Sequence, residues 1–207
     1  MLTQIVAHRG ASAEAPENTL EAFAKAIEMG ADMIEFDVRR DLSGALRISH
    51  DPIFDLALEL PTFEETLRLT QGRIQLDVEL KEPGCERDAI DLLLRYVPLD
   101  GFCITSFLVP ALREIRAIHA RIRTGLIFAS WNSDVRAACQ SEDCDVLVAQ
   151  YRLVDKAEEI GKPLFVWTVD DPALTRKLLD RPMVEAIVTN NPRQALAIRA
   201  SHATIRA

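Results

Sequence analysis

Short runs of apolar and β-branched residues alternate with amphipathic stretches along this chain. Runs of the first kind predict strands, and stretches with apolar residues three or four positions apart predict helices. The pattern predicts strands at Gln4–His8, Met33–Val38, Arg73–Leu80, Phe102–Ser106, Gly125–Phe128, Val146–Gln150, Leu164–Val169 and Ala186–Thr189. It predicts helices at Thr19–Met29, Thr62–Leu69, Glu86–Tyr96, Pro110–Ala120, Ser133–Gln140, Lys156–Ile160, Pro172–Leu179 and Pro192–Ala200. This order predicts one α/β domain, residues 1–207, folded as a parallel (β/α)8 TIM barrel; an open doubly wound sheet is the alternative.

The first predicted helix begins after a residue with a suitable side chain. Asn18 is a good N-cap, and Glu21 follows three residues later. Gly30 suits the C-terminal end of the helix. We therefore expect Asn18 to cap this helix.

The alternation breaks once, after the second strand, where no helix pattern precedes His50. Residues 33–49 predict a β-hairpin with its turn at Asp41–Gly44, because glycine adopts the positive φ that such turns need. With Arg40 facing Ala45, antiparallel pairing places His50 roughly opposite Glu35. The hairpin thus brings a histidine to the level of an acid on the second strand.

Composition and charge exclude several classes of protein. The 207 residues are 48% hydrophobic and 27% charged, which is typical of globular domains and not of disordered chains. A net charge of −8 argues against a non-specific nucleic-acid binder, which needs a basic surface. No run reaches the ~20 apolar residues of a membrane-spanning helix, and the first residues lack a secretory signal. We expect a cytoplasmic protein without an integral membrane segment; the oligomeric state is left open.

The four cysteines do not predict a metal site. None lies in a Cys-x-x-Cys pair, so we expect reduced and mostly buried thiols at Cys85, Cys103, Cys139 and Cys144.

Acidic residues share the inner face of two predicted strands. Glu35 and Asp37 are two positions apart, so both point to one side while Phe36 points to the other. Asp77 and Glu79 repeat the pattern on the next parallel strand. Converging buried acids are costly unless a cation or protonation compensates them. A bound metal is the simplest compensation, and oxygen ligands suit one hard divalent ion, Mg²⁺ or Ca²⁺. Pairing with Arg or Lys inside the barrel is the alternative, and for the deeper Asp77 a structural role is favoured.

Two histidines end their strands on the side where barrel active sites lie. His8 ends the first strand and His50 ends the hairpin. A histidine pair can give and take protons near neutral pH, as phosphoester cleavage requires. Arg9 offers a planar fork for phosphate oxygens, or it pairs with the neighbouring acids.

Motifs along nearly the whole chain resemble one known family. They are HRG at 8–10, PENT at 16–19, AF at 22–23, GAD at 30–32, EFDV at 35–38, HD at 50–51, PTFEETL at 61–67, ELK at 79–81, TSF at 105–107, WTVD at 167–170 and TNNP at 189–192. Each motif alone is weak, but the ordered set resembles the glycerophosphodiester phosphodiesterase family.

That resemblance implies a TIM-barrel enzyme that uses a divalent metal to split glycerophosphodiesters into glycerol 3-phosphate and an alcohol. It implies three metal-binding carboxylates, at Glu35, Asp37 and Glu79. It implies a general acid/base pair at His8 and His50, with the roles of the two unassigned. It implies substrate contacts from Arg9 to phosphate, from Lys81 as a basic neighbour and from Trp167 as an aromatic wall.

Two departures from the family pattern leave the substrate open. Members usually carry a sizeable insertion after the HD motif, where this chain has only Pro52–Leu60, so we expect an open mouth. Asn190 stands where members more often have Asp. The alternatives are a related phosphodiesterase acting on lysophospholipids or inositol-type phosphodiesters, with release of a cyclic phosphate, and a metal-binding barrel that serves as a ligand-binding module.

Overall fold

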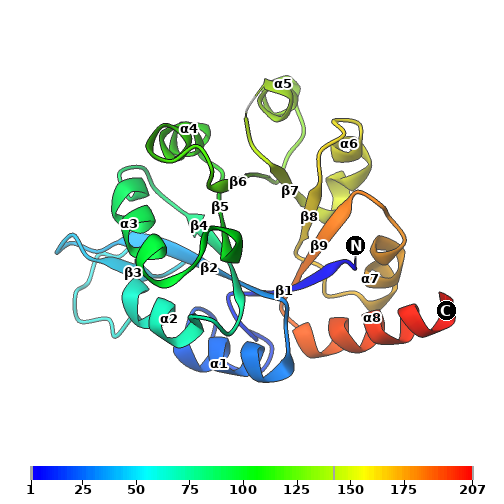
Figure 1. Cartoon of the computed structure of the whole chain (residues 1–207), viewed down its shortest axis with the longest axis horizontal. Helices are drawn as coiled ribbons and strands as arrows, with labels where there is room; N and C mark the ends of the chain where they lie inside the picture. The colour runs from blue at the N-terminus through cyan, green and yellow to red at the C-terminus, as the bar shows by residue number, and fades with distance from the viewer. Residues whose placement is uncertain (1, 142, 207) are drawn as a thin grey trace.

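Eight parallel strands form a closed barrel in the computed structural model, which describes residues 2–141 and 143–206. The barrel strands are β1 (Gln4–His8), β2 (Met33–Arg40), β4 (Gln75–Leu80), β5 (Phe102–Ser106), β6 (Arg123–Phe128), β7 (Val146–Gln150), β8 (Leu164–Trp167) and β9 (Val184–Thr189). They pair in chain order, and β1 pairs with both β2 and β9, which closes the ring (Figure 1). The predicted TIM barrel is confirmed, and the open sheet is excluded.

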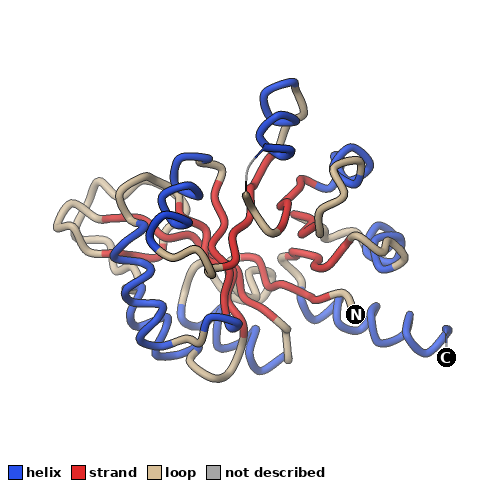
Figure 2. The backbone as a smooth tube through the Cα atoms, turned by 45° about the horizontal axis from the view of Figure 1, so that its top comes forward, coloured by secondary structure: helices blue, strands red, loops and turns tan. Residues whose placement is uncertain are grey.

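Helices surround the barrel in chain order (Figures 1 and 2). They are α1 (Leu20–Met29), α2 (Phe63–Thr70), α3 (Glu86–Tyr96), α4 (Val109–Ile118), α5 (Ser133–Ser141), α6 (Val154–Glu158), α7 (Pro172–Leu179) and α8 (Pro192–Arg206), with single 3₁₀ turns η1 (Leu99–Gly101) and η2 (Tyr151–Leu153). Their apolar faces cover outward-facing strand residues such as Ile34 and Phe36, both fully buried. Within the described ranges, no helix has the length and apolar character needed to cross a membrane.

The inside of the barrel is divided between a polar and an apolar side. The polar side comes from β1, which carries His8, and from β2 and β4, which carry the predicted site acids. The inward-facing apolar cluster comes mainly from the other strands and consists of Val6, Met33, Cys103, Ile127, Val146, Val148, Phe165, Ala186 and Val188. All four cysteines are free and buried, as expected.

Polar pairs span the barrel at the N-terminal ends of the strands. Arg123 on β6 forms two hydrogen bonds, of 2.7 and 2.6 Å, with Glu185 on β9, and its guanidinium lies over the Phe165 ring. Gln4 donates to Gln75 at 2.9 Å. These contacts support the end of the barrel opposite the predicted site.

The predicted hairpin is present, but its register differs by one residue. Strand β3 (Leu46–Ile48) pairs antiparallel with β2, with Arg40 opposite Leu46. The turn is longer than predicted because the Asp41 carboxylate accepts hydrogen bonds from the backbone N–H of Ser43 and Ala45, at 2.8 and 3.0 Å. The predicted pairing of Arg40 with Ala45 is therefore wrong by one residue. Continued to His50, the observed register leads to Phe36, one position from the predicted Glu35.

Helix α1 begins one residue later than its predicted cap implies. The Thr19 hydroxyl accepts a hydrogen bond from the backbone N–H of Ala22 at 3.2 Å, so Thr19 is the N-cap. Asn18 has a φ of 58° and directs its side chain elsewhere. The prediction of Asn18 as the cap is wrong because a tertiary contact engages its amide.

Gly10 permits the close approach of β1 and α1. Its φ is 82°, and a Cβ at this position would lie 2.7 Å from the backbone carbonyl carbon of Ala22. Only glycine fits this turn without a shift of the helix. The turn sets the positions of His8 and Arg9 directly before it.

Candidate active site

A cavity of about 110 Å³ lies at the C-terminal ends of the barrel strands. Seven of the eight predicted site residues line it, namely His8, Arg9, Glu35, His50, Glu79, Lys81 and Trp167. The eighth, Asp37, is fully buried and contacts Arg9 and Lys81. The tertiary structure therefore brings all the predicted residues into one site, at the end of the barrel where such sites are found.

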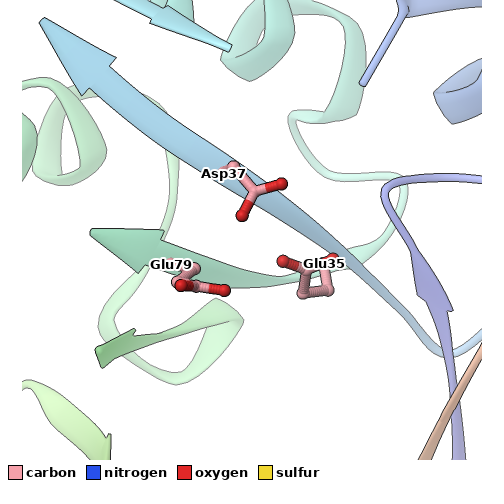
Figure 3. A group of neighbouring side chains, drawn as sticks. All are labelled: Glu35, Asp37 and Glu79. Atoms are coloured by element: carbon pink, nitrogen blue, oxygen red, sulfur yellow. The ribbon is translucent and has the colours of Figure 1, made fainter. Parts of the chain in front are cut away.

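The three predicted carboxylates form a compact group. Glu35 and Asp37 project from the inner face of β2, and Glu79 projects from β4 directly opposite Asp37 (Figure 3). One carboxylate oxygen from each residue lies within 4.8 Å of the others. A set of only oxygen donors at this spacing is suited to a hard divalent cation.

Burial and mutual repulsion make it unfavourable for all three carboxylates to be ionised together. Burial raises the pKa of Glu35 well above its usual range, and the charges of Asp37 and Glu79 raise it further. Burial and the Asp37 charge raise the pKa of Glu79 to about 7. Burial also opposes ionisation of Asp37, but Lys81, Asn18 and Arg9 hold the pKa of this carboxyl below its ordinary value.

Two basic residues partly neutralise the acids. Lys81 Nζ lies 2.7 Å from Glu79 Oε1 and 3.2 Å from Asp37 Oδ1. Arg9 Nε lies 3.2 Å from Asp37 Oδ2, and its Nη1 donates to Glu17 at 2.7 Å. The pairing of Arg9 with acids, the alternative considered from the sequence, is thus observed, although Arg9 also faces the cavity.

Two carboxylate oxygens lack directed partners. Asp37 Oδ1 and Glu79 Oε1 are buried and, within the described part of the chain, accept no well-aligned hydrogen bond despite their proximity to Lys81. Buried oxygens of this kind are costly unless a cation or a donor satisfies them. The residues present therefore fit a metal ion.

Asn18 is a site residue that the sequence reasoning missed. Its Nδ2 donates to Asp37 Oδ2 at 2.8 Å, and its Oδ1 accepts from the Asp37 backbone N–H at 3.4 Å. The positive φ of Asn18 aims the amide at β2 and away from α1. The signal in the sequence was an Asn directly before a Thr that can itself cap the helix.

The orientation of His8 is fixed by a chain of hydrogen bonds. Asn190 Nδ2 donates to Asp170 Oδ2 at 2.7 Å, so its Oδ1 is the atom that faces His8 Nδ1, also at 2.7 Å. An amide oxygen only accepts, so Nδ1 carries the proton when the ring is neutral. Burial lowers the pKa of His8, which keeps Nε2 unprotonated at neutral pH. Asn190 and Asp170 were not among the predicted site residues.

His50 reaches the same cavity from the hairpin. The Ser49 backbone N–H donates to the Asp37 carbonyl at 3.0 Å, and Arg39 Nε donates to the His50 carbonyl at 2.8 Å. The side chain of His50 is 42% exposed and lies 2.8 Å from Asp51 Oδ1. His50 thus occupies the open side of the site, whereas His8 is enclosed.

Part of the cavity lining is aromatic and aliphatic. Phe107 and Trp167 meet edge to face with ring centroids 5.8 Å apart, and Trp167 Nε1 donates to the Val148 carbonyl at 3.0 Å. Phe107 was missed as a site residue, although it ends the TSF motif. This wall can cover carbon atoms of a ligand whose polar groups face β1, β2 and β4.

The family model that matches this chain describes the glycerophosphoryl diester phosphodiesterase family and covers residues 8–83. A glycerophosphodiester phosphodiesterase of Caldanaerobacter subterraneus is 27% identical over 93% of this chain and 96% of its own length. One from Bacillus altitudinis is 48% identical over 51% of this chain and 58% of its own length.

Solved structures agree with this relationship. A glycerophosphodiester phosphodiesterase from Thermotoga maritima has a TM-score of 0.72 and 26% identity, covering 96% of this chain and 99% of its own. An Oleispira antarctica phosphodiesterase, solved with the product sn-glycerol-3-phosphate, shares the fold with a TM-score of 0.83 and 24% identity over 95% of this chain and 96% of its own. The family model, the curated relatives and the solved structures all indicate the glycerophosphoryl diester phosphodiesterase family, and they support a phosphoric diester hydrolase.

Proposed function

We propose that this enzyme hydrolyses glycerophosphodiesters to sn-glycerol 3-phosphate and an alcohol in a metal-dependent reaction. The observation that carries the proposal is the convergence of three carboxylates, two basic residues and two histidines on one cavity. The product complex of the Oleispira antarctica relative supports the choice of product. We also propose that residues 1–207 act as one domain, since the described strands belong to one sheet. The cytoplasmic location stays a prediction.

Glu35, Asp37 and Glu79 would hold one divalent ion, Mg²⁺ or Ca²⁺, with Asp37 oriented by the Asn18 amide. The bound ion would supply positive charge beside the phosphodiester oxygens. Its charge would also relieve the mutual repulsion that raises the pKa of Glu35 and Glu79.

Arg9 and Lys81 bind the phosphate oxygens and stabilise negative charge that develops there. A neighbouring hydroxyl of the glycerol unit attacks phosphorus, since a tethered nucleophile gains from proximity. His8 accepts the proton of that hydroxyl at Nε2, the ring atom that Asn190 leaves free. His50, at the open side, protonates the departing alcohol. Water then opens the cyclic phosphate with the two histidine roles reversed.

A coupled assay for glycerol 3-phosphate with glycerophosphocholine and glycerophosphoethanolamine tests the proposal. We expect turnover that a chelator abolishes and that added Mg²⁺ or Ca²⁺ restores. Glu79→Ala should lose activity and metal binding together. His50→Ala should retain metal binding and lose at least ~10²-fold in turnover. Unchanged turnover with a chelator would contradict the metal requirement, and normal turnover of the His50 variant would contradict its role.

The apolar wall favours a lysophospholipid as the second candidate substrate. Phe107 is 43% exposed, so its ring is available to an acyl chain at the cavity mouth. Turnover of lysophosphatidylcholine and glycerophosphocholine, measured by choline release, separates the two candidates. Product analysis in the same assay shows whether the reaction stops at a cyclic phosphate.

A further inference from the structure

One buried acid in the cavity has no part in the proposed mechanism. Asp77 lies on β4, one inward-facing position deeper than Glu79 and directly opposite Glu35 on β2. Only 1% of its surface is exposed, yet it lines the cavity. Asp77 therefore forms part of the floor beneath the carboxylate group.

The hydrogen bonds of Asp77 leave one oxygen available. Thr105 Oγ1 donates to Asp77 Oδ1 at 2.7 Å, and the Cys103 thiol approaches the same oxygen at 3.6 Å. Within residues 2–141 and 143–206, no described group donates to Oδ2. The Thr105 bond fixes the plane of the carboxyl group, so the orientation of Oδ2 is set before a ligand binds.

The position of Asp77 is unfavourable for stability. Glu35, Asp37 and Glu79 already crowd this end of the barrel, and a further buried carboxyl adds both desolvation and repulsion. A neutral side chain would fill the same space at lower cost. Residues that break a local rule in this way are expected at functional sites.

The chemistry of the cavity indicates which ligand group Asp77 receives. A carboxylate accepts hydrogen bonds, so it attracts a hydroxyl and repels a phosphate oxygen. Arg9 and Lys81 contact Asp37 and Glu79, which lie two positions nearer the C-terminal strand ends than Asp77. Val148 and Val188 line the apolar side of the cavity. If Arg9 and Lys81 hold the phosphate of a ligand, an attached polyol would therefore extend toward Asp77 on the floor of the cavity. A second phosphate would be repelled from that position.

We propose that Asp77, oriented by Thr105, binds a hydroxyl group of the glycerol unit and makes the site selective for polyol phosphates. This inference rests on the proposed function and extends it. The glycerol unit is the constant part of these substrates, so a fixed group on the floor can recognise it. The variable alcohol then leaves through the open side beside His50.

Calorimetric binding of two ligands tests the inference without turnover. The ligands are sn-glycerol 3-phosphate and methyl phosphate, which carries the same phosphate group but no hydroxyl, each with Mg²⁺ or Ca²⁺ present. We expect the wild-type chain to prefer glycerol 3-phosphate. Asp77→Ala should weaken the binding of glycerol 3-phosphate about 10- to 100-fold, as expected for the loss of one hydrogen bond to a charged group. The affinity for methyl phosphate should be unchanged. Asp77→Asn keeps an acceptor oxygen and should recover part of the loss.

A matched pair of threonine variants separates orientation from general damage. Thr105→Val removes the hydroxyl that holds Asp77 and should reduce the preference for glycerol 3-phosphate. Thr124→Val is the control, because Thr124 is also fully buried on the next strand and its Oγ1 has no hydrogen-bond partner in the described chain. It should leave the binding of both ligands unchanged.

Equal weakening of both ligands in Asp77→Ala and Asp77→Asn would overturn the inference and assign Asp77 to the phosphate or metal site. A wild-type chain that does not prefer glycerol 3-phosphate, or does not bind it, would also overturn it. If the preference depends on Asp77 but glycerophosphodiesters are not hydrolysed, the proposed function fails and the inference stands.

Discussion

The Asn18 side chain holds Asp37 through a hydrogen bond of 2.8 Å, although Asn18 occupies a position typical of a helix cap. The adjacent Thr19 performs the capping. Two neighbouring residues thus divide two tasks, one local and one tertiary. Asn18 suits the tertiary task because its φ of 58° is tolerated by asparagine better than by most other residues.

Replacement of these two residues should separate the tasks. Asn18→Gly keeps the positive φ but removes the amide, so we expect weaker metal binding and lower activity with little loss of stability. Thr19→Ala should reduce the free energy of unfolding by about 1 kcal/mol and leave metal affinity unchanged. Calorimetric metal titration and chemical denaturation measure the two effects. Equal metal affinity in Asn18→Gly and the wild type would refute the tertiary role.

Asn190 should control the protonation of His8. Its hydrogen bond raises the pKa of His8, against the larger lowering by burial. Asn190→Leu should therefore lower turnover about 10- to 100-fold and move the acid limb of the kcat/KM profile to lower pH. The measurement is a pH–rate profile.

Asn191 supplies the control for Asn190. Its Oδ1 accepts from the Gln194 backbone N–H at 3.1 Å at the start of α8, where it acts as a cap. Asn191→Ala should reduce stability by about 1 kcal/mol without a shift of the pH profile. A shift in the Asn191 variant, or none in Asn190→Leu, would be inconsistent with the assignment.

Gly10 and Gly30 should differ in their tolerance of alanine. Both have positive φ, of 82° and 76°, which costs about 1–2 kcal/mol for a residue with a Cβ. A Cβ at Gly10 would also clash with the backbone of Ala22. A Cβ at Gly30 would have no atom within 4 Å among the described residues. Gly10→Ala should therefore lose about 1–3 kcal/mol more than Gly30→Ala in chemical denaturation. Equal losses would show that α1 shifts without cost.

Glu79 should make the metal-free protein less stable as pH rises. Its folded pKa of about 7 lies above its ordinary value, so the folded state holds this proton more tightly than the unfolded chain. The resulting stability is present at acidic pH and is lost as pH rises through the folded pKa. With a chelator present, the melting temperature of Glu79→Gln minus that of the wild type should increase between about pH 5 and pH 8, because only the wild type has an ionisable side chain at this position. A constant difference would contradict this pKa.

The local pattern of the chain was sufficient for much of the fold. The segment Pro172–Leu179 was predicted with its observed bounds, and the acids Glu35 and Asp37 were predicted on one face of their strand. These features depend on residues within a few positions of each other, since helical and strand periodicities are local. The resemblance to a family could also be recognised from the sequence, because the motifs and their spacing along the chain can be read without coordinates.

Closure of the barrel and the partners of the site residues depended on tertiary structure. His8 meets Asn190 across 182 positions, through the pairing of β1 with β9. The Asn18 side chain does not cap α1, because its amide donates instead to Asp37 on β2, a charged and therefore stronger acceptor. The hairpin register followed the hydrogen bonds of the Asp41 turn. Periodicity decides which face a side chain occupies, but packing between distant segments decides which group it meets.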